Sequence, residues 1–146
     1  MSRISREMML MEWAYTASKR GTCGRLAVGA VIARDSRPIS AGYVGALSGA
    51  PHCVEAQCDL SKPCTRTVHA ELNAINFALR AGINIAGADM FVTDSPCIPC
   101  SYEIIEHKIA RVFFDRQYRV PLGIELLKTN GIIVVQVLAN GMTRNV

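Results

Sequence analysis

Two short stretches that are far apart in the sequence place the strongest constraint on how this chain of 146 residues folds. One is residues 69–71, His-Ala-Glu, and the other is residues 96–100, Pro-Cys-Ile-Pro-Cys. One imidazole and two thiols are three ligands of the kind that Zn2+ takes in proteins, and a tetrahedral ion then keeps one position for water. The chain is therefore expected to fold so that these two stretches meet.

The spacing within each stretch predicts where it lies on a helix. His69 and Glu71 are two residues apart, and side chains two apart on a helix point about 200° away from each other. Both can approach one ion only where the helix begins. Cys97 and Cys100 are three apart, a spacing that places two side chains together at a helix start. We therefore predict that two helix N-termini point at one metal ion, an arrangement that also favours thiolate over thiol.

Glu71 is placed to accept a proton from a water molecule at the fourth position of the metal. Zinc lowers the pKa of a bound water to about 7, and a nearby carboxylate can then take its proton. The pattern H-x-E followed by P-C-x-x-C is the signature of the zinc-dependent nucleobase deaminases. It predicts attack of water on C4 of a cytosine, with Glu71 as both base and acid, and release of the uracil product and ammonia.

Two alternatives explain less of this pattern. A redox C-x-x-C motif would account for Cys97 and Cys100 but would leave His69 and Glu71 unexplained. A purely structural zinc site is expected to be closed by four protein ligands, whereas three ligands and a carboxylate leave a position open.

Composition narrows the class of protein and its partners. The length suits one domain, residues 1–146, and the longest apolar run, near residues 132–139, is too short to cross a bilayer. No signal peptide is expected, so six cysteines indicate a reducing, cytoplasmic compartment in which clustered cysteines bind metals. A net charge of +4 suits an anionic nucleotide, but without a dense Lys/Arg stripe no nucleic-acid partner and no membrane partner are expected.

Hydrophobic periodicity predicts four helices and five strands in an α/β arrangement. The predicted helices are residues 5–20, 67–81, 97–107 and 120–129. The predicted strands are residues 26–33, 39–44, 88–93, 111–115 and 132–138, with a turn at 35–38 and a long structured loop at 45–63. The helix at 67–81 is expected to bury Ala70, Ala74, Phe77, Ala78 and Ala81, with Leu72, Ile75 and Leu79 on a broader buried side.

Three segments of the chain resemble the deoxycytidylate (dCMP) deaminase family of zinc-dependent cytidine and deoxycytidylate deaminases, including phage and bacterial members. They are residues 28–32, 66–75 and 95–100, and the likeness runs from about residue 14 to residue 137. The resemblance implies a three-layer α/β/α cytidine deaminase-like fold, with a mixed five-stranded sheet and helices on both faces. It also implies hydrolytic deamination of dCMP to dUMP, and a hexamer regulated by dCTP and dTTP, with Mg2+ accompanying the allosteric nucleotide.

The same resemblance suggests further site residues. Cys23 and Cys53 match family positions for a second, structural zinc, and Cys58 and Cys64 are available to complete it, with His52 as an alternative fourth ligand. The irregular spacing leaves ordinary thiols as the other interpretation. The predicted substrate-binding residues are Arg25, Val44, Ala70, Asn73, Ser95, Pro96 and Tyr118. Arg66 is a second candidate for binding a phosphate, and Arg80 matches a family position near a subunit contact. For Asn73 the alternative to substrate binding is a structural role.

One departure from the family pattern bears on the substrate. The family usually has Gly-Tyr-Asn-Gly, followed by a loop that contains proline, where this chain has Gly-Tyr-Val-Gly at residues 42–45 and Leu47 beyond it. The side chain of Val44 cannot form a hydrogen bond, so the preferred substrate can differ from that of the family or be less strictly selected. The alternatives are dCTP, a modified nucleotide such as 5-methyl-dCMP, a nucleoside or a base in tRNA, and, in another class, a non-catalytic zinc-stabilised module.

Overall fold

The computed structural model describes residues 2–53, 55–59, 61, 64, 66–118 and 120–146. Within these residues the helices are α1 (Arg6–Ser18), α2 (Ala70–Arg80), α3 (Ile98–Glu106) and α4 (Leu122–Thr129). The main sheet contains β1 (Gly29–Arg34), β2 (Arg37–Tyr43), β5 (Asp89–Asp94), β6 (Arg111–Arg116), β7 (Ile133–Val137) and β8 (Thr143–Asn145). A separate two-stranded ribbon is formed by β3 (Gly45–Ala46) and β4 (Thr67–Val68).

The main sheet has the strand order β2-β1-β5-β6-β7-β8 and is mixed. Strands β5, β6 and β7 are parallel, because α3 and α4 connect them as crossovers, and the other neighbouring pairs are antiparallel. The predicted mixed sheet and α/β class are confirmed. The predicted number of five strands is wrong, because the C-terminal residues Thr143–Asn145 add a sixth strand at the edge, paired with β7.

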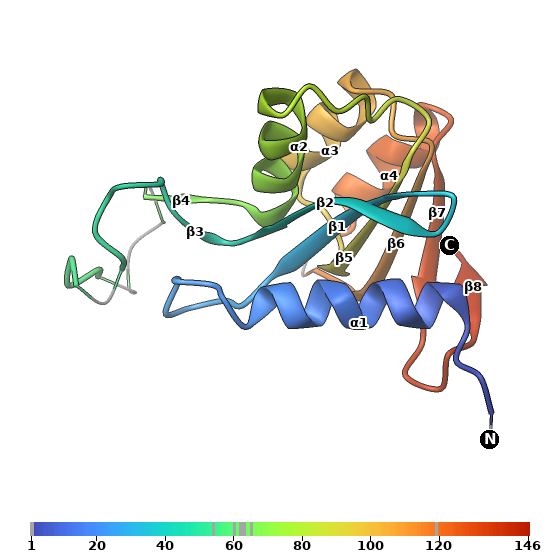
Figure 1. The fold of residues 1–146 in the computed structure, drawn as a ribbon, viewed down its shortest axis with the longest axis horizontal. Coiled ribbons are helices and arrows are strands. Elements are labelled where there is room, and N and C mark those ends of the chain that lie inside the picture. Colours follow the sequence, from blue (N-terminus) through green and yellow to red (C-terminus); the bar gives the residue numbers. More distant parts are fainter. Residues whose placement is uncertain (1, 54, 60, 62–63, 65, 119) are drawn as a thin grey trace.

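Helices cover both faces of the sheet, with α1 along one face and α2, α3 and α4 along the other (Figure 1). Side chains of β1 alternate between the two cores: Val31 and Ala33 pack with α1, while Ala30 and Ile32 pack beneath α2. Helix α1 lies so close to the sheet that a Cβ at Gly29 would come within 1.9 Å of the carbonyl oxygen of Ala14. Glycine at the start of β1 therefore permits this close approach.

The predicted helix at 67–81 needs two corrections. It begins at Ala70, because Thr67 and Val68 pair instead with Gly45–Ala46 as an extended ribbon. Phe77, Leu79 and Ala81 are not buried: 50% and 49% of the surfaces of Phe77 and Leu79 remain exposed, and Ala81 is exposed after the end of the helix. The buried residues of α2 are Ala70, Glu71, Ala74, Ile75 and Ala78.

The remaining boundaries differ from the predictions by a few residues. Ser5 caps α1 by accepting a hydrogen bond from the backbone N–H of Met8, and the helix ends at Ser18. The predicted turn forms at Asp35 and Ser36, which both have positive φ. In the predicted loop at 45–63, residues 54, 60, 62 and 63 lie outside the described residues. No helix in the described part of the chain is long and apolar enough to span a bilayer.

Candidate active site and metal centre

Three side chains with metal-binding atoms lie together where α2 and α3 begin. His69 is the N-cap residue of α2 and Cys97 is the N-cap residue of α3, and both have extended backbone. Cys100 lies in the first turn of α3 and is buried. Their ligand atoms lie within 4.8 Å of one another, and among the described residues no other group of this kind occurs. The structure thus brings together the predicted ligands at two helix N-termini.

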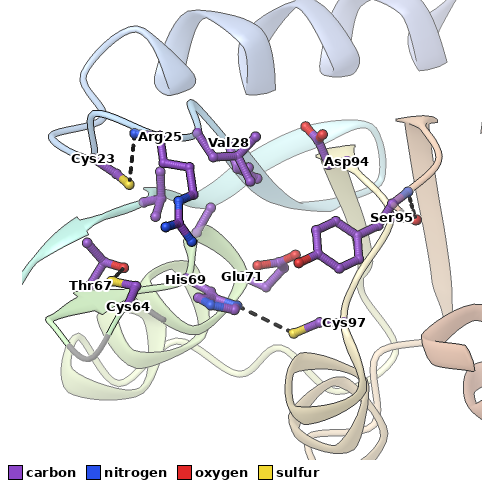
Figure 2. Close-up of a pocket in the computed structure, with 14 residues that line it drawn as sticks. Cys23, Arg25, Val28, Cys64, Thr67, His69, Glu71, Asp94, Ser95 and Cys97 are labelled. Atoms are coloured by element: carbon purple, nitrogen blue, oxygen red, sulfur yellow. Dashed lines mark hydrogen bonds between the residues drawn. The ribbon is translucent and has the colours of Figure 1, made fainter. Parts of the chain in front are cut away.

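The separations of these atoms suit a zinc ion. His69 Nδ1 lies 3.2 Å from Cys100 Sγ and 3.4 Å from Cys97 Sγ, and His69 and Cys97 face each other in Figure 2. Tetrahedral zinc bonded to one nitrogen and one sulfur holds the two atoms about 3.6 Å apart. One nitrogen and two sulfurs are also donors that suit zinc better than the oxygen-seeking Mg2+. The residues therefore fit the metal, with a fourth position left for a small molecule.

Hydrogen bonding within this group favours a thiolate at Cys97. The bonds that it accepts from Cys100 and from His69 lower the pKa of the Cys97 thiol to about 4. The interaction with Cys97 raises the pKa of the Cys100 thiol, and its burial and the nearby Glu71 carboxyl add to the effect. The hydrogen bond to Cys97 is also the main reason that the pKa of His69 is raised. These hydrogen bonds therefore favour the thiolate of Cys97, which is the form of cysteine that binds a metal cation.

Glu71 is a buried carboxyl group next to the three ligands. Only 4% of its surface is exposed, and the Cys100 thiol donates to its Oε2 across 3.5 Å. Burial raises the pKa of the Glu71 carboxyl to about 7, since the charged form loses its hydration. A carboxyl that titrates near neutrality can both accept and return a proton, which is the property needed for general acid–base catalysis.

The site opens onto a cavity of about 320 Å³. This volume lies within the range of small-molecule pockets, about 300–1,000 Å³. Of the predicted site residues, the cavity is lined by His69, Glu71 and Cys97, by Arg25, Val44, Ala70, Ser95 and Tyr118, and by Cys23 and Cys64 (Figure 2). Cys100 lies behind this wall. Residues from the segment before β1, from α2 and from the ends of β5 and β6 thus meet at one cavity.

A comparison with protein families agrees with this geometry. Residues 4–116 match the family model described as "Cytidine and deoxycytidylate deaminase zinc-binding region". The matched range contains both the His-Ala-Glu stretch and the Pro-Cys-Ile-Pro-Cys stretch. The chain belongs to the cytidine and deoxycytidylate deaminase family. It is therefore a member of a family of hydrolytic enzymes that cleave C–N bonds.

Individual relatives of this deaminase cover most of its length. It is 40% identical to ComE operon protein 2 of Bacillus subtilis, in a match that covers 94% of this chain and 74% of the relative. It is 35% identical to the deoxycytidylate deaminase of Mycobacterium phage D29, over 80% of this chain and 99% of the relative. The crystal structure of dCMP deaminase from cyanophage S-TIM5, in complex with dCMP and dUMP, superposes with a TM-score of 0.84 at 27% identity. That match covers 93% of this chain and 99% of the phage chain. The cytidine deaminase-like fold is confirmed by this likeness.

Two predicted substrate-binding residues of the deaminase lie outside the cavity wall. Asn73 donates from Nδ2 to the backbone carbonyl oxygens of Tyr43 at 2.8 Å and Val68 at 3.4 Å. Its side chain therefore connects α2 to β2 and β4, as in the structural alternative. Pro96 is buried, and a Cβ at Gly123 would lie 2.0 Å from its carbonyl oxygen. Pro96 therefore packs against α4 while it leads into Cys97.

Four residues that line the cavity were not predicted: Leu26, Val28, Thr67 and Asp94. The sequence does carry a signal for Asp94, because this residue directly follows the predicted strand at 88–93, and ligands often bind at the carboxyl ends of parallel strands. Leu26 and Val28 were predicted to lie in a strand at 26–33, but β1 begins only at Gly29, and Thr67 was predicted to lie in a helix but lies in β4.

The other four cysteines of the deaminase are neighbours but do not form a compact group. No three of the sulfurs of Cys23, Cys53, Cys58 and Cys64 lie within 4.8 Å of one another in the described residues. Burial raises the pKa of Cys53, and the nearby thiols of Cys58, Cys23 and Cys64 add to the effect. Cys23 Sγ accepts the backbone N–H of Arg25 at 3.4 Å. Hydrogen bonds from the Thr67 hydroxyl and from the backbone of Arg66 and Thr67 lower the pKa of Cys64.

Three further residues with distinctive side chains, Arg66, His107 and Arg80, lie outside the cavity wall. The Nη2 of Arg66 donates to the carbonyl oxygen of Pro51 at 2.6 Å. His107 is the C-cap residue of α3, with its Nδ1 2.9 Å from the carbonyl oxygen of Glu103, so it lies at the end of the helix and away from the metal ligands. Arg80 is exposed at the end of α2, and its subunit contact stays a prediction.

Proposed function

We propose that this chain is a zinc-dependent dCMP deaminase, which converts dCMP and water to dUMP and ammonia. The observation that supports this most strongly is the buried carboxyl of Glu71, placed beside one imidazole and two thiols at a cavity of about 320 Å³. The phage structure matched over nearly its whole length is a dCMP deaminase in complex with dCMP and dUMP. Both the chemistry of the site and this likeness favour the same substrate.

His69, Cys97 and Cys100 would hold the zinc ion in this enzyme. When bound there, zinc supplies a Lewis acid that makes water acidic enough to act as a nucleophile near pH 7. The extended N-cap conformations of His69 and Cys97 aim both side chains at one point, and the two helix N-termini stabilise the thiolates.

Glu71 moves the protons of the reaction. It takes one proton from the attacking water, whose oxygen forms a bond to C4 of the cytosine ring, and gives that proton to N3. It then takes the second proton of that oxygen and passes it to the exocyclic amine. The bond from C4 to this nitrogen breaks with its electron pair on nitrogen, and ammonia leaves while C4 becomes a carbonyl. The burial of Glu71 keeps bulk water from competing for these protons.

The walls of the cavity suggest how the nucleotide lies. Arg25 lines the cavity and carries the positive charge that a 5′-phosphate needs. Ala70 and Val44 are apolar and buried, and they suit the flat face of the base. Ser95 and Tyr118 offer hydroxyl groups to the sugar or the base. These assignments, together with those for Asn73 and Pro96, are predictions that a complex with dUMP would test.

A substrate panel tests the proposed activity. We expect ammonia release from dCMP with a kcat/KM at least about tenfold higher than from deoxycytidine, since a hydrogen bond to a charged group contributes about 1.5–3 kcal/mol. Changing Arg25→Gln should remove most of that preference, and Arg20→Gln, on the exposed segment after α1, is the matched control. The panel also includes dCTP and 5-methyl-dCMP. Equal rates for dCMP and deoxycytidine would contradict the substrate assignment, and no ammonia from any compound would contradict the enzyme.

We further propose a second, structural zinc held by Cys23, Cys53, Cys58 and Cys64. Its support is the nearness of the four thiols and the backbone N–H donors at Cys23 and Cys64, which stabilise thiolates. Metal analysis of purified protein should give about two zinc ions per chain. The double change Cys58→Ser and Cys64→Ser should reduce this to about one. A single ion in the wild type that survives the double change would contradict the second site.

The wider family features stay predictions for this chain. They are a homohexamer and regulation by dCTP and dTTP with Mg2+. Val44 and Leu47 replace residues that the family usually has in the segment after β2, and Leu47 is 64% exposed. We therefore expect that regulation by nucleotides is the family feature in which this chain differs most from its relatives.

A further inference from the structure

Two ion pairs of the same type join the opposite ends of β5 and β6. Asp94 and Arg116 are register partners at the carboxyl ends of the strands, and Arg116 Nη2 lies 2.7 Å from Asp94 Oδ1. Asp89 and Arg111 are register partners at the other end, where Arg111 binds both carboxylate oxygens, with Nη2 2.7 Å from Oδ2 and Nε 2.8 Å from Oδ1. The exposed fractions of the side chains are also similar. They are 52% for Arg116 and 50% for Arg111, and 14% for Asp94 and 16% for Asp89. Each arginine also lies over an aromatic ring, Tyr15 or Phe113.

The two pairs differ in what surrounds them. Asp94 lines the active-site cavity, and Asp89 does not. Beyond Asp94, the backbone N–H of Ser95 donates to the carbonyl oxygen of Arg116 at 2.8 Å. The hydroxyl of Ser95 then accepts the backbone N–H of Tyr118 at 2.7 Å. Arg116 is thus connected to three residues of the cavity wall. Its side chain binds Asp94, its carbonyl group binds Ser95, and Ser95 in turn binds Tyr118.

Arg116 also contacts the segment before β1 and helix α1. Its Nη2 lies 3.4 Å from the carbonyl oxygen of Ala27, which stands between the lining residues Leu26 and Val28. Its guanidinium group lies 5.6 Å from the centre of the Tyr15 ring, and the Tyr15 hydroxyl donates to Asp115. One side chain therefore contacts the end of β5, the segment before β1 and helix α1.

One carboxylate oxygen of Asp94, Oδ1, accepts two hydrogen bonds. Oδ1 accepts the hydroxyl of Thr93 at 2.8 Å as well as Arg116, and the same Thr93 oxygen accepts the backbone N–H of Gly29 at 3.3 Å. Among the described residues, no group donates to Oδ2 of Asp94. Without Arg116, the carboxylate would keep only the neutral hydroxyl of Thr93 as a partner, and its position at the cavity would be poorly defined.

We infer that Arg116 is a positioning residue of the substrate cavity, which holds Asp94, Ser95 and Tyr118 where the nucleotide is bound. This inference rests on the proposed function, because dCMP is the ligand whose affinity should change. It assigns no contact with the reacting atoms to Arg116. The Asp89–Arg111 pair at the other end of the same strands has similar exposure and more hydrogen bonds between its two side chains, but no connection to the cavity. A loss of binding found only in the Arg116 variant therefore reports positioning and not stability.

The test compares Arg116→Gln with Arg111→Gln, and Asp94→Asn with Asp89→Asn as a second set. We expect both arginine variants to lose a similar small amount of thermal stability and to keep their zinc. Arg116→Gln should raise KM for dCMP about tenfold while kcat changes by less than about threefold, because the lost group orders the binding wall and not the chemistry. Arg111→Gln should keep the wild-type KM. Equal KM values for the two arginine variants would overturn the inference.

Amide hydrogen exchange tests the inference apart from turnover. The amides of Ser95 and Tyr118 should exchange faster in Arg116→Gln than in Arg111→Gln, because their hydrogen bonds depend on the segment that Arg116 holds. Unchanged exchange at both amides would overturn the positioning role. If the wild-type protein releases no ammonia from dCMP, the proposed function fails, and the exchange comparison still decides whether Arg116 holds this wall.

Discussion

Replacing Glu71 with glutamine is expected to lower kcat for dCMP about 10³- to 10⁴-fold, the contribution of a well-placed general acid–base. Glutamine has nearly the same shape as glutamate but cannot take a proton from water at neutral pH. Because Glu71 is not one of the three residues assigned to the metal, zinc content should stay at the wild-type value. The measurements are ammonia release under saturating dCMP and zinc content by mass spectrometry.

Glu12→Gln is the matched control, since Glu12 is an exposed residue of α1 and carries no role in the site. It should keep wild-type kcat. Retained turnover in Glu71→Gln would remove Glu71 from its role as acid and base. Loss of turnover together with loss of zinc would instead make Glu71 a residue that supports metal binding.

Replacing Cys100 with serine is expected to abolish turnover by preventing metal binding. The sulfur lies 3.2 Å from His69 Nδ1 inside the domain, and a serine hydroxyl is a poor substitute for a thiolate toward zinc. Zinc content should fall by about one ion per chain, and the melting temperature should fall because binding of the metal to the folded chain contributes to its stability. Wild-type protein stripped with a chelator should behave in the same way.

Ser101→Ala separates loss of metal from loss of stability. Ser101 is buried next to Cys100, and its hydroxyl donates to the carbonyl oxygens of Cys97 at 2.9 Å and Gly123 at 3.2 Å. Its removal should cost about 1 kcal/mol of stability, the usual value for a hydrogen bond. We expect Ser101→Ala to keep its zinc. A Cys100→Ser protein with full zinc and full activity would show that Cys100 is not a ligand.

Prediction from sequence succeeded where the relevant pattern is local. Apolar runs and helical spacing located each of the four described helices and each of the five expected strands to within a few residues, because these patterns depend on neighbours along the chain. The exposed faces of Phe77 and Leu79 were missed, since periodicity identifies an apolar stripe but not how much of it the sheet covers. Strand β8 was missed because its three residues, Thr143–Asn145, are polar and become a strand only beside β7.

Residue type and spacing along the chain were enough to predict His69, Cys97, Cys100 and Glu71 at two helix starts, because ligand spacing on a helix follows from the geometry of one turn. The structure brings the three predicted ligands together, with Glu71 beside them. The residues that surround this group could not be predicted in the same way. Asp94 lies at the cavity and its partner Arg116 beside it, while Asn73 is turned toward backbone carbonyls, and these positions follow from the register between strands and the packing of helices across the sheet.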